Sequence, residues 1–441
     1  MNPLAKLLKA LPPGTQVVAG GTVVLGAASY LHIAAAGHSL SKQDMAGVSL
    51  LWTLVMSVGI GLFFPIEQEL TRIVAARAVR GEGAAPVLRR AALLTAGILV
   101  VVLGLIGAFA RLIADRLFSG DMQLVLALGG AFVGMALCYV TRGILAGLGR
   151  FTAYGVQLAI DGGLRIVLAV GCALAGVHSA LAFSLILSVA PLVALACTLP
   201  VTLKAALPGA PIAWSELVRG LGLLICSTLL AQVVVNAAVV STKLLAPTQV
   251  ALVAALLSAL VLARVPLFVF GSLQASLLSG LSSSAAAGDH PGFVKMLRKT
   301  GVVVLLLGLS GGVPAALLGP WLIQVLFKSA NVLSHLDFLW LAAGTTCYML
   351  AMVLGQALMV LHRHRSQLLA WVLAVAVLVG VTLLPGDIAT RVSAAFAAGS
   401  LVAAAAMVLM LLRSPAVRGT AVPDAVAGPQ PTAARANSGS A

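Results

Sequence analysis

CYVTRGILAGLGRFTAYGVQLAIDGGLRI, the stretch from Cys138 to Ile166, decides how this chain folds. It contains the end of one apolar segment, a short turn with glycine and arginine, and the start of a second apolar segment that carries Asp161 and Arg165. If the second segment is a membrane helix that begins near Phe151, Asp161 lies about 15 Å deep, near the middle of a bilayer core about 30 Å thick. The i, i+4 spacing places Asp161 and Arg165 on one helix face, where each charge lowers the desolvation cost of the other. The two glycines between them leave room for a neighbouring helix, water or a ligand.

The composition is that of a membrane protein. Hydrophobic residues make up 61% of the 441 positions and charged residues only 9%, with a mean hydropathy of +1.11, which leaves too little polar surface to cover a soluble globule. The net charge of +15 does not indicate a nucleic-acid partner, because the basic residues cluster between apolar runs without interleaved aromatic residues. All five cysteines fall inside apolar segments with no CxxC spacing, so we expect packing roles and no disulfide or zinc site.

The apolar segments predict an all-α polytopic membrane protein with about twelve transmembrane helices. Each segment is long enough to cross a bilayer as a helix, and most contain glycine or proline. The predicted spans are 17–37, 45–65, 91–110, 122–146, 152–175, 179–203, 218–240, 248–271, 300–326, 337–361, 367–385 and 392–412.

The basic residues predict the orientation. With the N-terminus in the cytoplasm, 19 of the 27 lysines and arginines fall at the inner side, six fall in outer loops, and Arg165 and Arg264 lie inside spans. This asymmetry favours a topology with both termini in the cytoplasm.

Short repeated motifs predict two related halves. FPIEQ at 64–68 resembles FGSLQ at 270–274, an offset of 206 residues, and the Cys-Tyr pair at 138–139 has a counterpart at 347–348, an offset of 209. Both offsets correspond to six spans, which predicts two pseudo-symmetric six-helix bundles around a central cavity, related by an axis along the membrane normal.

This repeat also predicts the domain boundaries. The segment KAALPGAPIAWSE is rich in proline and glycine and suits a linker, whereas the end of the chain is rich in alanine, proline, glycine and serine without an apolar run. We expect an N-terminal six-helix lobe at 1–203, a cytoplasmic linker at 204–216, a C-terminal six-helix lobe at 217–413 and a disordered cytoplasmic tail at 414–441.

Polar groups inside the spans are the candidate functional residues, because such groups are costly in a bilayer. The candidates for the wall of a substrate cavity are Asp161, Arg165, Arg264, Gln232, Asn236 and Gln356. An isolated charge such as Arg264 costs on the order of 3 kcal/mol at that depth and needs a partner or a water-filled cavity. Two structural alternatives stay open: Asp161 and Arg165 could form a purely structural ion pair, and the i, i+4 amides of the seventh span could only make interhelical hydrogen bonds.

A second group of candidates lies where the second span ends. Glu67, Glu69 and Arg72 follow the apolar run in the sequence IEQELTR and are expected at the inner interface. They could form a gate at the mouth of the cavity or simply a solvated helix end.

Signatures of enzymes are missing from the sequence. It contains no P-loop, HExxH or GxSxG motif, and no loop between the predicted spans is long enough to fold a catalytic domain. We therefore expect neither enzyme activity nor a cofactor or metal site.

Three stretches carry a family resemblance: RGILAGLGRFTAYGVQLAIDGGLRI at 142–166, GLFFPIEQELTR at 61–72 and ARVPLFVFGSLQASLLSGLS at 263–282. They resemble bacterial polysaccharide exporters, which are lipid-linked oligosaccharide flippases of the multidrug/oligosaccharidyl-lipid/polysaccharide (MOP) exporter superfamily. The resemblance implies two six-helix bundles that form a V around a cavity, in the inner membrane of a bacterium. It also implies that cavity arginines, here Arg165 and Arg264, engage a lipid diphosphate or acidic sugars.

The function expected from these features is export of a lipid-linked oligosaccharide or polysaccharide precursor by alternating access. Asp161 would hold Arg165 in the empty state and release it to the substrate, because a guanidinium offers a fixed fork of donors to phosphate oxygens. The expected partners are the lipid-linked glycan, membrane lipids and envelope glycan-assembly proteins. Two alternatives are a proton- or sodium-coupled drug or metabolite antiporter of the same superfamily, in which Asp161 titrates, and a non-transporting scaffold that recruits envelope enzymes through its tail.

Overall fold

The computed structural model describes residues 14–245, 265–327 and 332–414, together with isolated positions between 246 and 264. All regular elements in these ranges are helices. They are α2 (Thr15–Ser39), α3 (Lys42–Leu54), the π-helical turn η1 (Val55–Gly59), α4 (Ile60–Val79), α5 (Ala85–Ala108), α6 (Ala110–Leu117), α7 (Met122–Gly147), α8 (Phe151–Leu174), α9 (Ala180–Ala205), α10 (Trp214–Val218), α11 (Leu221–Leu245), α13 (Val265–Ala286), α14 (His290–Phe327), α15 (His335–Val360), α16 (His364–Thr382) and α17 (Ile388–Leu412).

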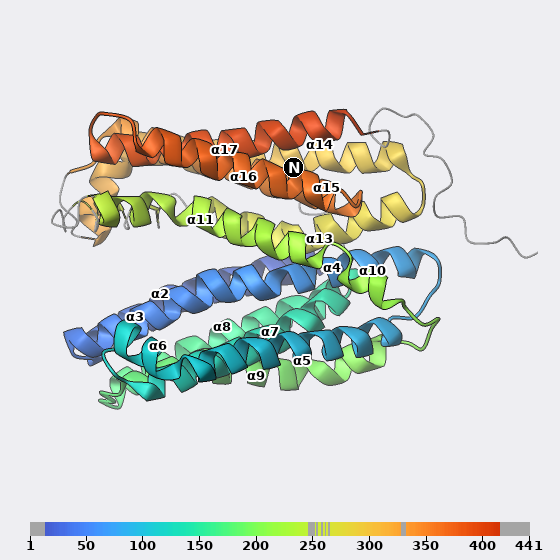
Figure 1. Cartoon of the computed structure of the whole chain (residues 1–441), viewed down its shortest axis with the longest axis horizontal. Coiled ribbons are helices and arrows are strands. Elements are labelled where there is room, and N and C mark those ends of the chain that lie inside the picture. The colour runs from blue at the N-terminus through green and yellow to red at the C-terminus, as the bar shows by residue number, and fades with distance from the viewer. Residues whose placement is uncertain are drawn as a thin grey trace, which may run out of the picture.

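These helices form two bundles that lie side by side (Figure 1). Helices α2 to α9 build the N-terminal bundle and α11 to α17 build the C-terminal bundle. Within the described ranges, 11 helices are long and apolar enough to cross a membrane. The prediction of an all-α, multi-pass membrane protein with two pseudo-symmetric bundles is confirmed. The predicted eighth span, 248–271, begins in residues that lie outside the described ranges and ends within α13.

Several helices continue beyond the predicted spans. Helix α4 runs to Val79, α13 runs to Ala286 and α14 already begins at His290. The corresponding predicted spans end at 65 and 271 and begin at 300, so each helix is at least ten residues longer on that side. Residues 67–72, predicted at the end of the second span, therefore lie inside helix α4 and not at its end. Hydropathy marks only the apolar part of a helix, whereas polar residues here extend α4 because they are buried against the rest of the protein.

The two bundles repeat the same helical hairpin. Helices α7 and α15 have 26 residues each, and both end in a turn whose second residue is in the left-handed region, Gly149 with φ 68° and His362 with φ 56°. The N–H of Gly149 donates to the carbonyl of Ala146, and the N–H of His362 donates to that of Met359. Equivalent residues of the two hairpins, such as Gly149 and His362, are thus 213 positions apart in the sequence, and we call this spacing the structural offset. The short motifs, at offsets of 206 and 209 residues, thus indicate the repeat of six spans but differ from the structural register by four to seven residues, because short matches in an apolar sequence do not fix the register.

Helices α2 and α8 pack backbone to backbone in the N-terminal bundle. A Cβ atom at Gly162 would lie 2.7 Å from the Cα atom of Leu25, so only glycine permits this approach. At Gly163, by contrast, a Cβ atom would meet nothing within 4 Å. One of the two glycines between Asp161 and Arg165 therefore serves helix packing, as the sequence predicts.

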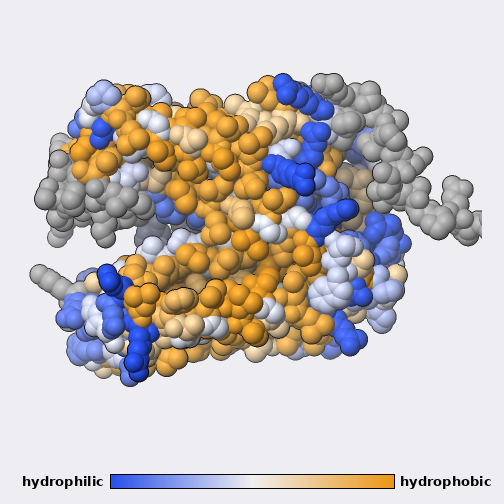
Figure 2. All heavy atoms as spheres, viewed as in Figure 1, coloured by the Kyte–Doolittle hydropathy of each residue, from blue (hydrophilic) through white to orange (hydrophobic). Residues whose placement is uncertain are grey.

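The bundles meet toward one end of the molecule, which we call the linker end and define by the loops 80–84, 206–213 and 361–363. Helices α2 and α4 pack on α13, and α4 also packs on α11. Val18 of α2 and Ala275 of α13 belong to one buried cluster. Figure 2 shows the described atoms of the two bundles in contact toward the linker end, with a notch between them at the opposite end.

Candidate functional site

Three charged side chains form a buried triad in the N-terminal bundle. The Nε atom of Arg165 lies 2.8 Å from Oδ1 of Asp161, and the Nη2 atom of Arg142 lies 3.0 Å from Oδ2. The side chains of Arg142, Asp161 and Arg165 are 7%, 3% and 6% exposed. Both carboxylate oxygens of Asp161 therefore accept charge-assisted hydrogen bonds, which are the strong class in a protein interior.

The local fold explains why these residues meet. Asp161 and Arg165 are one turn apart on α8, as their spacing predicts. Arg142 comes from the last turns of α7, and the tight turn at Gly149 folds α8 back against it. The guanidinium of Arg142 also lies 5.7 Å above the ring of Tyr139, a cation–π arrangement that helps to hold it in place.

Helix α4 adds a second buried carboxylate beside the triad. Glu67 accepts a hydrogen bond of 2.7 Å from the hydroxyl of Tyr154 through Oε1. Helix α4 can approach because α7 has Gly143 here, where a Cβ atom would lie 2.8 Å from the carbonyl oxygen of Glu67. In the described part of the chain, Oε2 of Glu67 and Nε of Arg142 are buried without a hydrogen-bond partner.

A neutral polar pair completes this region. The side-chain amide of Gln157 donates to the hydroxyl of Thr141 at 2.9 Å, so α7 and α8 are joined by a hydrogen bond as well as by the ion pairs. Within the described ranges, no group of three or more histidine, cysteine, aspartate or glutamate side chains could hold a metal ion. The chemistry that the region offers is hydrogen bonding and charge, with two guanidinium groups around a single aspartate.

The C-terminal bundle has no such charges at the equivalent positions. The structural offset of 213 pairs the triad residues 142, 161 and 165 with Gly355, Ala374 and Leu378, all of them buried. The hairpin therefore packs well with apolar residues alone, and ion pairs are not a requirement of this fold. Buried ion pairs rarely stabilise a protein more than apolar residues of the same volume do.

The gate candidates Glu67, Glu69 and Arg72 are buried rather than solvated, and Arg72 reaches the other bundle. Arg72 contacts Glu69 through two hydrogen bonds, of 2.6 Å and 3.0 Å. Across the bundle interface, Nη1 of Arg72 lies 3.3 Å from Nε2 of His362, in the loop between α15 and α16. Burial and, second to it, the nearby Arg72 guanidinium lower the pKa of His362 from its ordinary 6.5 to about 4. Arg72 and Glu69 therefore lie at the contact between the bundles at the linker end, whereas Glu67, predicted to act with them, lies in the region around the triad.

The remaining predicted residues lie elsewhere. Asn236 donates to the backbone carbonyl of Gln232 at 2.8 Å, and both side chains are half-buried on α11. Gln356 is buried inside the C-terminal bundle, where neither of its side-chain polar atoms has a hydrogen-bond partner in the described structure. Arg264 lies outside the described residues. The structure thus brings together Asp161 and Arg165 but not the full predicted set.

Sequence reasoning missed Arg142, Tyr154 and His362. Arg142 was counted with the basic residues of an inner loop, yet it is buried in α7. A signal existed, because the apolar run around Arg142 continues to Gly147 and so extends the helix past it. No local signal identifies His362 as a partner of Arg72, because that contact joins residues 290 positions apart.

Similar proteins include curated relatives and solved structures. No family model matches the chain. Curated relatives include two uncharacterized proteins of Mycobacterium tuberculosis. Rv3630 is 27% identical over 92% of this chain and 96% of its own length, and Rv1510 is 26% identical over 91% and 94%.

Solved structures resemble the chain over nearly its whole length. A mutant of the Vibrio cholerae MATE transporter VcmN has a TM-score of 0.74 at 15% identity, covering 92% of this chain and 97% of its own. A MOP superfamily transporter from Pyrococcus furiosus has a TM-score of 0.73 at 14% identity, covering 92% and 99%. These similar structures are transporters rather than enzymes. This chain therefore has the fold of the MATE transporters of the MOP superfamily.

Proposed function

We propose that this protein is an alternating-access exporter of a lipid-linked oligosaccharide or polysaccharide precursor. The observation that carries the proposal is the triad of Arg142, Asp161 and Arg165, which has one guanidinium more than it has carboxylates. The Glu67 carboxylate beside the triad is hydrogen-bonded to Tyr154 and forms no ion pair with either arginine in the described structure. Two guanidinium groups that share one aspartate favour an anionic ligand, and the diphosphate of a glycan lipid carrier is such a ligand.

In this mechanism Asp161 acts as the resident anion of an empty site. Phosphate oxygens of the substrate replace it as acceptors for Arg142 or Arg165, because a guanidinium binds phosphate through two parallel hydrogen bonds. Release of the substrate returns both arginines to Asp161. The exchange keeps the arginines paired throughout, so neither is left as an isolated charge in the membrane.

Movement of the two bundles would carry the glycan across. The contact of α4 with α13 and the pair of Arg72 with His362 close the linker end. If that end faces the cytoplasm, as the basic residues predict, this conformation faces outward, and separation of Arg72 from His362 would open the inner side. The glycan would pass between the bundles while its lipid tail stays in the bilayer. The proposed location is the bacterial inner membrane, with membrane lipids and envelope glycan-assembly proteins as partners.

A drug or metabolite antiporter like the MATE transporters is the second candidate. Glu67 favours it, because a buried carboxylate with one free oxygen could take up and release a proton during transport. Asp161, by contrast, is engaged by two arginines. The Pyrococcus furiosus transporter is described as having a binding pocket of reversed polarity that suggests a different function.

Transport by the purified protein in liposomes separates the two candidates. Wild-type protein should move a fluorescent lipid-linked glycan diphosphate between leaflets, and it should not move a cationic dye. Arg142→Gln and Arg165→Gln should each slow the glycan lipid, whereas the exposed control Arg111→Gln should not. Movement of the dye driven by a pH gradient, abolished by Glu67→Gln, would instead establish the antiporter.

A further inference from the structure

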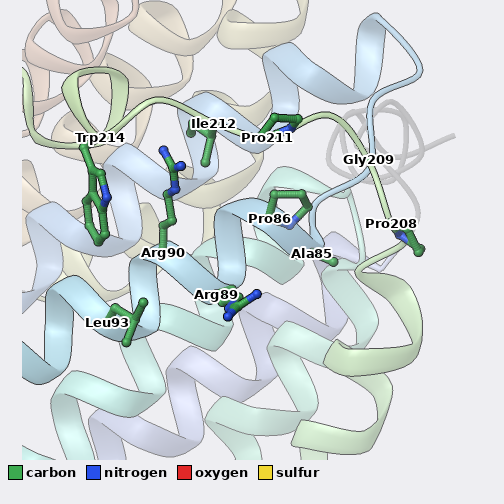
Figure 3. A pocket seen from close by; sticks show the side chains of 10 residues that line it. All are labelled: Ala85, Pro86, Arg89, Arg90, Leu93, Pro208, Gly209, Pro211, Ile212 and Trp214. Atoms are coloured by element: carbon green, nitrogen blue, oxygen red, sulfur yellow. The ribbon is translucent and has the colours of Figure 1, made fainter.

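A surface pocket of about 530 Å³ lies at the linker end of the N-terminal bundle, away from the triad. It is formed by the first turns of α5 and by the segment between α9 and α10 (Figure 3). The arginines Arg89 and Arg90 line it together with the aromatic ring of Trp214.

The walls of the pocket are fixed by hydrogen bonds. The N–H of Ala85 donates to the carbonyl of Leu207 at 3.0 Å, which ties the start of α5 to the segment that follows α9. The guanidinium of Arg77 donates to the carbonyl of Ala210 and also lies 2.9 Å from a carboxylate oxygen of Glu82. The pocket is therefore formed in advance, and a ligand does not have to order a loose loop.

The arginines of the pocket are available to a ligand. Arg90 lies 5.4 Å from the ring centroid of Trp214, and Arg89 is exposed. Neither arginine forms an ion pair with a carboxylate in the described part of the chain. Figure 3 shows the side chains of Arg90 and Trp214 side by side, with the side chain of Arg89 at the preceding position of α5. Two guanidinium groups near one preformed pocket suit a phosphate group, which accepts several hydrogen bonds at once.

The position on α5 points to a lipid. From residue 91 to the end of α5 the sequence contains no charged residue, and Leu93 is 57% and Val100 71% exposed on its outer surface. Arg89 and Arg90 thus lie at the end of α5 where the apolar run stops, beside the half-exposed Trp214. Arginine and tryptophan at this level are typical of the headgroup region, and the exposed apolar residues below offer a surface for acyl chains.

We propose that this pocket binds the phosphate headgroup of an anionic phospholipid from the leaflet at the linker end. Arg89 and Arg90 hold the phosphate, Trp214 supports Arg90, and the acyl chains lie along the exposed face of α5. This inference does not depend on the transported substrate, because the pocket is separate from the triad. The site would anchor the start of α5 and the connection between the bundles to the membrane surface.

Native mass spectrometry of the purified full-length protein tests this assignment. Phosphatidylglycerol should bind more tightly than phosphatidylcholine, and Arg89→Gln/Arg90→Gln should weaken phosphatidylglycerol binding roughly 10- to 30-fold. The matched control is Arg298→Gln/Lys299→Gln, which removes the same charge from exposed positions near the start of α14. The control should change the affinity less than about twofold, because no pocket lies there to add to the electrostatic attraction.

Two further ligands distinguish the source of the phosphate. Inorganic phosphate should not compete at millimolar concentration, because it lacks acyl chains. Polyprenyl phosphate should compete no better than phosphatidylglycerol. An equal loss of affinity in the control variant would overturn the proposal in favour of diffuse surface charge. Binding of polyprenyl phosphate without binding of phosphatidylglycerol would overturn it in favour of a substrate site.

Discussion

Arg142 and Asp161 belong to different helices, yet Nη2 of Arg142 lies 3.0 Å from Oδ2 of Asp161. This contact changes the meaning of the pair within α8. An Asp161–Arg165 pair alone would be neutral, whereas here two guanidinium groups share the carboxylate of Asp161. The other buried carboxylate beside them, Glu67, is hydrogen-bonded to Tyr154 instead, and this arrangement is the basis of the proposal that the site takes an anionic substrate.

Removal of the central carboxylate should destabilise the protein strongly. Asp161→Asn leaves Arg142 and Arg165 buried without a counter-charge, which costs about 3–5 kcal/mol in comparable buried pairs. The thermal midpoint of unfolding in detergent measures this loss. The exposed Asp115→Asn serves as the control and should leave the midpoint within about 1 °C. A wild-type midpoint for Asp161→Asn would mean that water or lipid already neutralises the arginines.

Adjacent glycines on α8 should respond in opposite ways to alanine. Gly162→Ala inserts a methyl group against the backbone of α2 and should destabilise the protein by about 1–3 kcal/mol. Gly163→Ala adds a methyl group in open space and should stabilise the helix by about 0.4–1 kcal/mol. Unfolding of both variants under identical conditions provides the measurement. Equal effects would show that α2 and α8 are not packed as described.

The hydrogen bond between Tyr154 and Glu67 should be detectable as a coupling energy. Tyr154→Phe removes the donor and leaves a buried carboxylate oxygen unpaired, which costs about 1–3 kcal/mol. In a Glu67→Leu background, the same change should cost much less. A double-mutant cycle on unfolding free energies measures the difference. A coupling energy near zero would rule out the contact as a stabilising interaction.

Acidification should weaken the closed linker end through His362. Its pKa is lowered to about 4 in the closed state, so the open state binds the proton more readily. The contribution of neutral His362 to the closed state is therefore fully present above about pH 6.5 and is lost as the pH falls toward 4. Spin labels at Ala78→Cys and Ala287→Cys, in a background without the native cysteines, report the distance between the bundles. Longer distances should appear on acidification.

The variant His362→Gln is the control for this pH effect. It keeps a polar side chain near Arg72 but cannot be protonated in this range, so the pH-dependent change in distance should become smaller. The ring of His364 lies 6.2 Å from that of His362, so His362→Gln/His364→Gln should abolish the change. If the change persists in this double variant, another group controls closure.

Contacts within one helix could be predicted from the sequence, and contacts between helices could not. The Asp161–Arg165 contact follows from i, i+4 spacing, which fixes the geometry once α8 is a helix. The partner Arg142 depends on the register of the α7–α8 hairpin, which the turn at Gly149 determines. Likewise, hydropathy identified most helices but not their ends, since burial between the bundles allows α4 to continue through charged residues.

A charge-free replacement of the triad tests the central claim most directly. In Arg142→Met/Asp161→Val/Arg165→Met, apolar residues of comparable size replace all three charged residues, and the equivalent positions of the C-terminal bundle are likewise uncharged. Such replacements of buried ion pairs are often neutral or stabilising by about 1–4 kcal/mol, so the variant should fold with wild-type stability or better. We expect it to lose transport of the lipid-linked glycan diphosphate in liposomes by at least about 100-fold, which corresponds to about 2.8 kcal/mol. A stable variant that transports at the wild-type rate would contradict the assignment of the triad as the substrate site.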